Sequence, residues 1–396
     1  MIDLSAIQSA LHQFGFDGWL LMDFRGSNVL ARRVLNLETR HPQSRRLFYF
    51  IPASGPPRKL VHRIEAAALD HLPGEKTIYL KWQELEAALA TLVAGSRRIA
   101  MEYSPRNGNP YISRVDAGTV EVIQATGVQV ASSGDLIQLF EAAWTDDQWA
   151  SHQEANQHTT AAYELVWKFV ADQVRAGAAI RETTVQQLIM DHFARHAMTT
   201  YSPPIVGVNA HSGDPHYAPE VGHDAEIKTG DFLLVDLWAK MDRPGAVYSD
   251  LTRVGFVGDT VPEQYEDIFR IVAQARDTAI ETVRSAFAAD RPLHGWEVDR
   301  ACRNVIEAAG YGEYFCHRTG HSIGQETHGN GANMDDLETH DERLLLPRTC
   351  FSIEPGIYLP EFGVRSEVNV YIAADKQVHV TGGPLQTSVV PIMAYW

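Results

Sequence analysis

The sequence predicts a two-part protein, in which a small α/β unit is followed by a larger α+β unit. The chain has 396 residues, which suits two domains at about 150 residues per domain. Short β-prone runs alternate with helical patterns up to about residue 140, and this alternation is typical of α/β units. A helix start is marked at Thr145. After it, long helical patterns and apolar strand-like runs follow one another without regular alternation. We therefore expect domains at 1–144 and 145–396.

The first unit is predicted from hydrophobic spacing and turn residues. Apolar residues recur every three or four positions in the expected helices and cluster in short β-branched or aromatic runs in the expected strands. The expected helices cover 5–14 and 82–93, and the expected strands cover 19–22, 46–51, 77–80 and 99–102.

The second unit begins with a capping box, because Thr145 is followed three positions later by Gln148. The helical pattern after it runs to about residue 174, and a second helix is expected over 184–197. Two further helices are expected over 262–288 and 296–309, and Gly310 fits the end of the last one as a C-cap residue.

Charge and composition exclude several classes of protein. The formal net charge of −16 argues against a nucleic-acid-binding protein, which normally carries a basic patch. No apolar run is long enough to span a bilayer, and the first 16 residues lack the pattern of a signal peptide, so we expect a cytoplasmic protein without membrane contact. The 3 cysteines suggest neither a disulfide framework nor a zinc knuckle, and we expect buried thiols.

Two aspartates stand in or beside apolar strand-like runs around a predicted hairpin. Asp236 follows the run FLLV and precedes Leu237, and Asp250 opens the next β-prone run, with a Pro-Gly turn signal between them. Adjacent antiparallel strands would aim both carboxylates at one point, where they repel unless a cation or a proton lies between them. The alternative is that Asp236 is a strand-end turn residue and Asp250 a helix cap.

Further acidic and imidazole groups follow downstream. His317, His321 and His328 lie within twelve residues of one another in a glycine-rich stretch, and Glu354 and Glu367 each stand in an apolar strand-like run. Four carboxylates and an imidazole suit hard or borderline divalent ions such as manganese, cobalt, iron or zinc. They are enough for two ions that share bridging ligands.

These motifs resemble the pita-bread metallopeptidases, and within them the proline-specific branch of Xaa-Pro dipeptidases (prolidases) and Xaa-Pro aminopeptidases. The family's metal ligands come in the order Asp, Asp, His, Glu, Glu. The matching residues lie in LLVDLWA, YSDLTR, HRTGHSIG, SIEPGIY and VRSEVNV, and they are Asp236, Asp250, His321, Glu354 and Glu367. The resemblance covers the chain from about Thr145 to its C-terminus and implies a pita-bread (creatinase/aminopeptidase-like) catalytic domain there.

The resemblance also implies roles for other residues. His216 and His328 would stabilise the tetrahedral intermediate, with His216 also contacting the substrate, and His317 would be an additional pocket histidine. Glu354 would act as the general base, and Arg365 would grip a substrate carboxylate, which suits guanidinium geometry.

The implied activity is metal-dependent hydrolysis of the peptide bond before proline in short peptides. A hydroxide between two divalent ions, manganese or cobalt first and zinc or iron second, would attack the carbonyl group. Xaa-Pro dipeptides are the expected substrates, and longer Xaa-Pro peptides are the alternative. The family commonly forms homodimers, so we expect a homodimer.

Two departures from the family pattern stand out. The two aspartates are 14 positions apart, more than the family usually has, and residues 241–246 look like the added material. Val368 follows Glu367, where an acidic or amide residue would be expected to support the ligand.

Other functions stay open from the sequence alone. The run Gly320–Gly324 fits G-x-S-x-G, the nucleophile elbow of serine hydrolases. Ser322 would then be the nucleophile, with Asp375 and His379 as its partners. Some relatives of the pita-bread fold hydrolyse small guanidino or amidino compounds without a metal, and others bind ligands without catalysis, but both usually lack part of the ligand set. Hydrolysis of a non-peptide C–N bond by the same five ligands is a further alternative.

Overall fold

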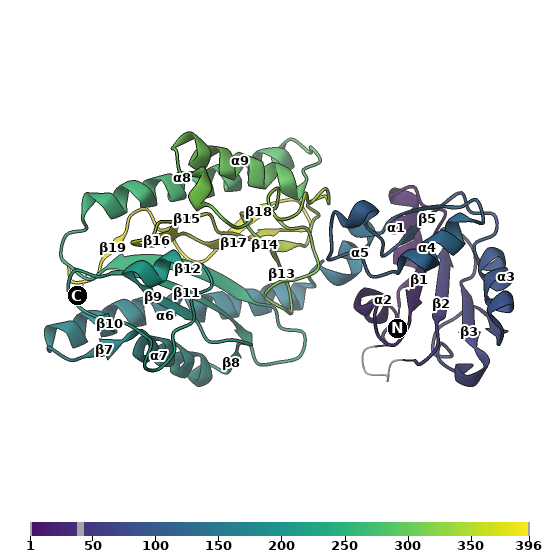
Figure 1. Cartoon of the computed structure of the whole chain (residues 1–396), viewed down its shortest axis with the longest axis horizontal. Helices are drawn as coiled ribbons and strands as arrows, with labels where there is room; N and C mark the ends of the chain where they lie inside the picture. The colour runs from purple at the N-terminus through teal and green to yellow at the C-terminus, as the bar shows by residue number, and fades with distance from the viewer. Residues whose placement is uncertain (1, 38–42, 395–396) are drawn as a thin grey trace. The chain divides into compact units, whose positions relative to one another are not determined.

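The computed structural model describes residues 2–37 and 43–394. The chain divides into two compact units, Met1–Glu141 and Ala142–Trp396 (Figure 1). Among the described residues, no helix has both the length and the apolar character needed to cross a membrane.

The first unit is built on a mixed sheet of six strands in the order β4-β3-β2-β1-β5-β6. Its strands are β1 Gly18–Asp23, β2 Leu47–Pro52, β3 Arg58–His62, β4 Glu75–Tyr79, β5 Arg98–Met101 and β6 Gln129–Ser132. Its helices are α1 Leu4–Gln13, α2 Val29–Val34, α3 Trp82–Leu92, α4 Ala117–Gln124 and α5 Gly134–Glu141, with short 3₁₀ turns η1 Arg63–Glu65 and η2 Pro105–Asn107.

Alternating side chains give this sheet two apolar faces. Trp19 and Leu21 of β1 belong to the core shared with α1, α2 and α5, and Leu20 and Met22 belong to the core shared with α3 and α4. A sheet covered by helices on both faces confirms the predicted α/β class. The sequence patterns missed β3, β6 and the helices α2, α4 and α5.

Over residues 142–394, which the structure describes, the second unit combines several small sheets with four α-helices. The helices are α6 Asp146–Arg175, α7 Glu182–Arg195, α8 Glu263–Ala288 and α9 Gly295–Ala308, with 3₁₀ turns η3 Asn209–Gly213 and η4 Gly312–Tyr314. The strands before α8 are β7 Ile180–Arg181, β8 Met198–Thr199, β9 Ile205–Val208, β10 Glu226–Ile227, β11 Phe232–Met241 and β12 Ser249–Phe256. The strands after α9 are β13 Ser322–Ile323, β14 Cys350–Ile353, β15 Gly356–Tyr358, β16 Gly363–Arg365, β17 Val368–Ile372, β18 Val378–Thr381 and β19 Val390–Pro391.

The β11–β12 hairpin and the strands β14 and β17 lie between two helix pairs (Figure 1). One sheet has the order β19-β12-β11-β8, with β9 also paired to β11, and a second has the order β13-β14-β17-β18. Helices α8 and α9 lie on one side of these strands, and α6 and α7 lie on the other. The predicted α+β class of the second unit is therefore confirmed.

Helix α6 starts where the capping box predicts. The Thr145 hydroxyl accepts a hydrogen bond from the Gln148 amide at 3.2 Å, and the Gln148 side chain accepts one from the Thr145 amide at 2.9 Å. These bonds satisfy two of the amides that a helix N-terminus leaves without a partner. At the end of α9, Gly310 has a φ of +88°, which is the left-handed conformation that favours glycine after a helix.

The β11–β12 hairpin carries the two aspartates in register. Trp238 lies opposite Asp250 and Asp236 lies opposite Thr252, so the two aspartates are diagonal neighbours on one face of the ladder. The alternative positions, a strand-end turn for Asp236 and a helix cap for Asp250, are wrong because both residues lie within strands.

The cysteines differ from expectation at one position. Cys302 and Cys350 are buried thiols, but Cys316 is exposed. Cys316 lies in the irregular segment after η4, where no apolar period exists from which burial could be judged.

Candidate metal centre

The second unit brings the five predicted ligands together from the β11–β12 hairpin and from the ends of strands that follow α9. Asp236 and Asp250 project from β11 and β12, His321 directly precedes β13, Glu354 directly follows β14, and Glu367 lies between β16 and β17. Strand β14 pairs with both β13 and β17, which aligns the last three predicted ligands along one sheet. Glu367 reaches the hairpin because its amide donates a hydrogen bond to the Thr252 carbonyl at 3.2 Å.

The distances between donor atoms fit a shared site. His321 Nε2 lies 3.5 Å from Asp250 Oδ2 and 3.3 Å from Glu354 Oε1. Asp250, His321 and Glu367 each offer a ligand atom within 4.8 Å of the other two. His321 Nδ1 lies 3.2 Å from the Ser322 carbonyl, and such a bond fixes the ring so that Nε2 can face a metal ion.

The site has buried oxygens that a cation would satisfy. Asp236 Oδ1 and Glu367 Oε1 are buried and have no hydrogen-bond partner among the described residues. A buried carboxylate oxygen without a partner is costly. Because the donors are four carboxylates and one imidazole, the set fits hard or borderline divalent ions.

The pKa shifts of the predicted carboxylate ligands also fit a cation site. Burial, reinforced by the neighbouring carboxylate of Asp250 and opposed by Arg365, raises the pKa of Asp236 to about 7. Burial and the same neighbour raise the pKa of Glu367 well above its usual value. The pKa of Glu354 is lowered. Burial alone would raise it, but the neighbouring side chains of His321, His317 and Arg365 outweigh the effect of burial. The raised pKa values of Asp236 and Glu367 show that their charged forms are disfavoured in this cluster, and a bound cation would favour those charged forms.

Sequence reasoning missed Thr252 and Tyr358 as supports of the ligands. The Thr252 hydroxyl donates to Glu367 Oε2 at 2.9 Å and accepts from Arg365 Nε at 3.0 Å. Thr252 stands two positions after Asp250 on β12, so period-two spacing in the strand would have placed both on one face. The Tyr358 hydroxyl accepts a hydrogen bond from Arg365 Nη1 at 3.0 Å.

Arg365 faces the predicted ligands in this structure. Its guanidinium is buried and forms an ion pair with Asp236. This ion pair holds the Asp236 carboxylate in place. A contact between Arg365 and a substrate carboxylate stays a prediction.

Glu354 is supported from the strand that carries it. Ser352 Oγ donates to Glu354 Oε1 at 2.9 Å and accepts from the His321 amide at 2.9 Å. At Gly320 an added Cβ would lie 1.9 Å from the Ser352 carbonyl oxygen. Glycine at this position therefore lets the His321 segment approach β14 closely.

Two of the predicted site histidines, His328 and His216, are exposed. The ring centroid of His328 lies 4.4 Å from that of His321 in an edge-to-face arrangement. The neighbouring ring of His321 is the main cause that lowers the pKa of His328 to about 3; shielding of part of the His328 ring from water and the proximity of His216 add to this shift. The backbone of His216 is fixed by its own amide, which donates to Asp214 Oδ1 at 3.0 Å.

His317 is tied to the support of the predicted ligands. Its Nε2 lies 2.6 Å from the Tyr358 hydroxyl and its Nδ1 lies 2.7 Å from the Arg318 carbonyl. Burial lowers the pKa of His317 to about 4, so the ring is neutral at pH 7.

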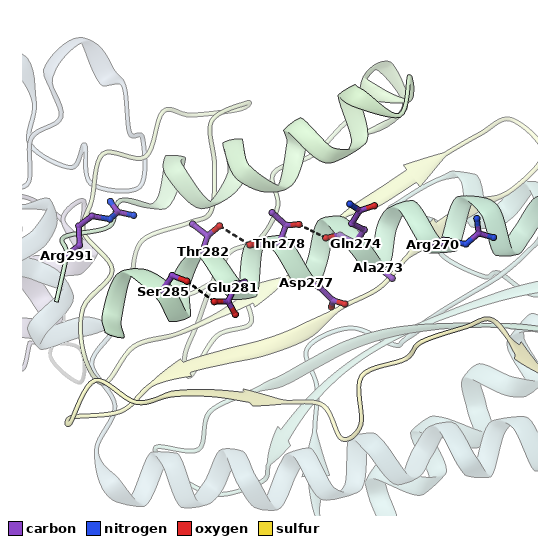
Figure 2. Close-up of a pocket in the computed structure, with 9 residues that line it drawn as sticks. All are labelled: Arg270, Ala273, Gln274, Asp277, Thr278, Glu281, Thr282, Ser285 and Arg291. Atoms are coloured by element: carbon purple, nitrogen blue, oxygen red, sulfur yellow. Dashed lines mark hydrogen bonds between the residues drawn. The ribbon is translucent and has the colours of Figure 1, made fainter. Parts of the chain in front are cut away.

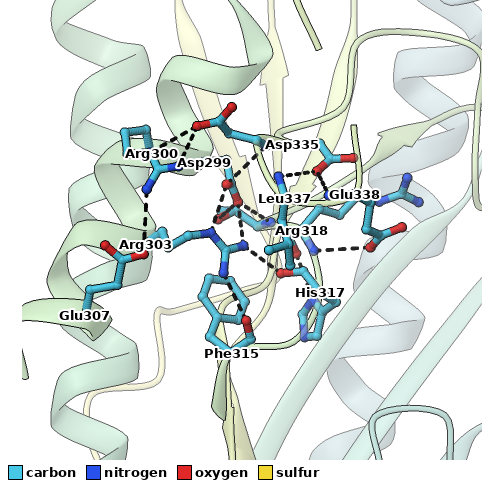
Figure 3. A network of polar contacts seen from close by, with 12 residues as sticks. Asp299, Arg300, Arg303, Glu307, Phe315, His317, Arg318, Asp335, Leu337 and Glu338 are labelled. Atoms are coloured by element: carbon cyan, nitrogen blue, oxygen red, sulfur yellow. Dashed lines mark hydrogen bonds and ion pairs between the residues drawn. The ribbon is translucent and has the colours of Figure 1, made fainter. Parts of the chain in front are cut away.

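A buried ion pair holds the segment that leads to His321 (Figure 3). Asp299 and Arg303 of α9 pair through two contacts of 3.1 Å. Asp299 Oδ1 accepts from the Thr319 amide at 2.8 Å and from its hydroxyl at 2.7 Å, and Arg303 donates to the His317 carbonyl at 2.8 Å. No sequence pattern indicated this network, since both charged residues lie in an ordinary helical pattern.

Ser322 does not have the surroundings of a nucleophile. Its side chain is buried, and its Oγ accepts a hydrogen bond from the Gly331 amide at 2.9 Å. Within the described ranges, no hydrogen bond joins Ser322 to Asp375 or His379. The ring of His379 instead lies near Trp149, with 5.6 Å between centroids.

A pocket that contains none of the predicted ligands lies along the solvent-exposed face of α8 (Figure 2). It has a volume of ≈ 880 Å³, and none of the side chains around it is a predicted site residue. They are Arg270, Ala273, Gln274, Asp277, Thr278, Glu281, Thr282, Ser285 and Arg291.

Fold and donor set together define a metallopeptidase of the pita-bread type. Residues 150–374, more than half of the chain, match metallopeptidase family M24, and the chain belongs to this family. It is 27% identical over 349 residues to a probable dipeptidase PepE of Mycobacterium tuberculosis, with 86% of this chain and 85% of the relative covered. It is 34% identical over 182 residues to an Xaa-Pro dipeptidase of Pyrococcus horikoshii, with 45% and 46% of the two chains covered.

Solved structures show the same fold. Dipeptidase PepE from Mycobacterium ulcerans superposes with a TM-score of 0.66 at 23% identity, covering 98% of this chain and 96% of that one. An X-prolyl aminopeptidase from Caenorhabditis elegans, described as having a di-nuclear active site, superposes with a TM-score of 0.61 at 16% identity. That match covers 98% of this chain and 62% of the other.

Proposed function

We propose that the protein hydrolyses the peptide bond before proline in short peptides, with Xaa-Pro dipeptides as its substrates. The observation that carries this proposal is the convergence of Asp236, Asp250, His321, Glu354 and Glu367, in which two buried carboxylate oxygens lack a partner among the described residues. Dipeptidases among the relatives, including an Xaa-Pro dipeptidase, support the substrate class.

Two divalent ions would be held by these five side chains, with manganese or cobalt proposed first and zinc or iron as alternatives. Four carboxylates, each with two oxygens, and one imidazole exceed what one tetrahedral ion requires. An X-prolyl aminopeptidase of the same fold is described as dinuclear. When bound, such ions supply a water that ionises near neutral pH and a Lewis acid for the carbonyl oxygen.

Glu354 would carry the proton in the proposed reaction. Its carboxylate has a lowered pKa because His321, His317 and Arg365 outweigh the effect of burial, so it is available as a base at pH 7. We assign to it the removal of a proton from the attacking water and the delivery of that proton to the proline nitrogen as the peptide bond breaks.

His328 and His216 would donate hydrogen bonds to the carbonyl oxygen of the substrate as it becomes an oxyanion. A neutral imidazole carries one N–H that can donate to an oxyanion, and the lowered pKa of His328 keeps that ring neutral. Because His328 is exposed beside His321, its N–H can reach a substrate that enters from solvent. Positioned donors of this kind matter most in the transition state.

The direct test uses purified protein that has been stripped with a chelator and then given manganese or cobalt. Hydrolysis of an Xaa-Pro dipeptide is compared with that of an Xaa-Pro tripeptide and of the matched Xaa-Ala dipeptide. Metal-dependent cleavage of the Xaa-Pro dipeptide alone supports the proposal. Cleavage of the tripeptide instead would make the protein an aminopeptidase, and equal cleavage of the Xaa-Ala dipeptide would remove the proline specificity.

A variant guards this test against a contaminating peptidase. Glu354→Gln removes the proposed base and keeps the size of the side chain. We expect its rate of Xaa-Pro hydrolysis to fall by about a hundredfold or more. An unchanged rate would mean that the measured activity does not come from this site.

We further propose a homodimer as the assembly of the active protein. The resemblance to the proline-specific branch supports this assembly. Light scattering on the metal-loaded protein tests it, and a mass of one chain, 44.1 kDa, would contradict it.

A further inference from the structure

Three histidines that take no part in the carboxylate site gather where α6 and α7 pack together. His158 lies on α6, His192 lies in the last turn of α7, and His196 is the C-cap residue of α7. Each of the three offers a ring nitrogen within 4.8 Å of the other two. The four-residue spacing of His192 and His196 puts both on one face at the end of the helix.

The rings are packed together. The centroids of His158 and His196 lie 4.2 Å apart with nearly parallel planes, and those of His192 and His196 lie 4.6 Å apart. The three side chains range from buried at His192 through half-buried at His158 to exposed at His196. A small ion can therefore approach the cluster from the side of His196.

One of the three rings is oriented by the backbone. His192 Nε2 lies 3.0 Å from the carbonyl oxygen of His158. A ligating imidazole usually donates its second N–H to such a group, which fixes the ring and leaves the other nitrogen for the metal. The rings of His158 and His196 have no hydrogen-bond partner among the described residues, so both keep ring nitrogens for a ligand.

The local environment disfavours protonated rings. Burial and the nearby ring of His196 lower the pKa of His158, and Glu154 only partly opposes this. Burial also lowers the pKa of His192, which the hydrogen bond to His158 partly offsets. Neutral imidazole is the form that binds metals.

We propose that His158, His192 and His196 form a second metal site, which binds one borderline divalent transition ion such as zinc, nickel or copper, with water in the remaining position. Three imidazoles and no carboxylate suit these ions. The oxygen-rich cluster around Asp250 suits harder ions, so the two sites differ in selectivity.

An ion at this site would fasten α7 to α6. Helix α6 contacts the hairpin that carries Asp236 and Asp250: Thr159 Oγ1 lies 2.9 Å from Ser249 Oγ. The Tyr163 hydroxyl donates to the Leu251 carbonyl at 2.5 Å. Because a ligand that binds only the folded state stabilises it, zinc should raise the unfolding temperature through this site.

The test must separate the two sites. A background variant, Asp250→Asn with His321→Gln, removes two donors from the carboxylate site and leaves the three histidines. In this full-length background we expect one equivalent of nickel or zinc to bind in calorimetric titration, and zinc to raise the unfolding temperature.

His196→Ala is then added to the background, with His223→Ala as the matched control because His223 is also an exposed histidine. We expect His196→Ala to weaken nickel binding by about tenfold or more and to abolish the zinc-induced rise in unfolding temperature, while His223→Ala changes neither. His158→Gln should repeat the effect of His196→Ala. Equal nickel affinity in the His196→Ala and His223→Ala proteins, or no nickel binding in the background, would overturn the proposal.

Discussion

The guanidinium of Arg365 forms an ion pair with the carboxylate of Asp236, and both side chains are buried. In the sequence, Asp236 is a charge inside an apolar strand, which is costly unless the charge is paired. Arg365 pairs with Oδ2 of Asp236, and the other carboxylate oxygen of Asp236, Oδ1, has no hydrogen-bond partner among the described residues. The residue therefore has one oxygen fixed by the protein and one available to a cation.

Arg365→Gln should weaken metal binding by about ten- to a hundredfold, because loss of a group that orients a ligand has effects of this size. The measurement is the affinity for manganese by calorimetry, together with KM for an Xaa-Pro dipeptide and for its C-terminal amide. If Arg365 gripped the substrate carboxylate instead, KM for the free acid would rise while metal affinity and KM for the amide stayed unchanged.

Thr252→Val should lower the unfolding free energy by about 1–3 kcal/mol, since it leaves Arg365 Nε and Glu367 Oε2 without this partner at nearly constant volume. Thr252→Ser is the control, because it keeps the hydroxyl and loses only a methyl group, at a cost of about 1 kcal/mol. Denaturant unfolding measures both. A valine variant no less stable than the serine variant would show that the hydroxyl does not support the site.

Much of the fold was predictable from the sequence because long elements carry strong periodic patterns. Helix α6 begins at the predicted capping box, and α8 and α9 lie within a residue or two of the expected ranges. Strands β13 and β15 have two and three residues, which is too short for a period-two pattern to be recognised. The fold class is therefore confirmed, while the small sheets that align His321, Glu354 and Glu367 were not predicted.

The site was predictable only as far as local patterns reach. The four predicted carboxylate ligands stand out because each is a charged group in or beside an apolar run, and His321 stands out as one of three histidines in a glycine-rich stretch. Their supports do not: Ser352 and Asp299 act through contacts with His321 and Thr319, respectively. Such contacts depend on how distant segments pack. An acidic or amide residue would be expected at Val368 to support a ligand. The amide side chain of the next residue, Asn369, takes this role instead: its Oδ1 accepts a hydrogen bond from the Asp250 amide at 3.1 Å.

Asp299→Asn should lower the unfolding free energy by about 3–5 kcal/mol, because it leaves the buried guanidinium of Arg303 without its charged partner. Xaa-Pro hydrolysis should fall as well, since Asp299 holds the segment before His321. The matched control is Asp267→Asn, whose ion pair with Arg270 is exposed at both ends, with side-chain exposures of 51% for Asp267 and 74% for Arg270. An exposed carboxylate contributes about 0–1 kcal/mol, so equal losses in the two variants would contradict the role of the buried network.

Removal of metal should destabilise the second unit. Ions at about 100 times their Kd stabilise the folded state by about 2.7 kcal/mol, so chelation should lower the unfolding temperature by about 5 °C or more. Calorimetry with and without chelator measures this shift. Asp236→Ala should reduce the shift, whereas Asp259→Asn, at an exposed position, should leave it unchanged. A shift of the same size in Asp236→Ala would place the stabilising ions elsewhere.

His152 offers a test of pH dependence away from the predicted ligands. Its ring is fully buried, with Nδ1 2.8 Å from the Tyr248 carbonyl and Nε2 2.7 Å from Thr381 Oγ1. It also stacks on Trp149, with 5.7 Å between centroids. Burial lowers the pKa of His152 to about 4, whereas the unfolded chain has a histidine pKa of about 6.5.

The stability that His152 contributes should therefore be complete above pH 6.5 and should be lost as the pH falls from about 6.5 to about 4. In this window the unfolded chain binds a proton at His152 and the folded chain does not, so acid favours unfolding by up to about 3 kcal/mol. His152→Gln keeps hydrogen-bonding groups but cannot titrate. The difference in unfolding free energy between wild type and this variant, measured by denaturant unfolding at pH 7 and pH 4, cancels the other titrating groups. That difference should shift by about 3 kcal/mol against the wild type at pH 4, and a difference independent of pH would mean that His152 is not held neutral in the folded protein.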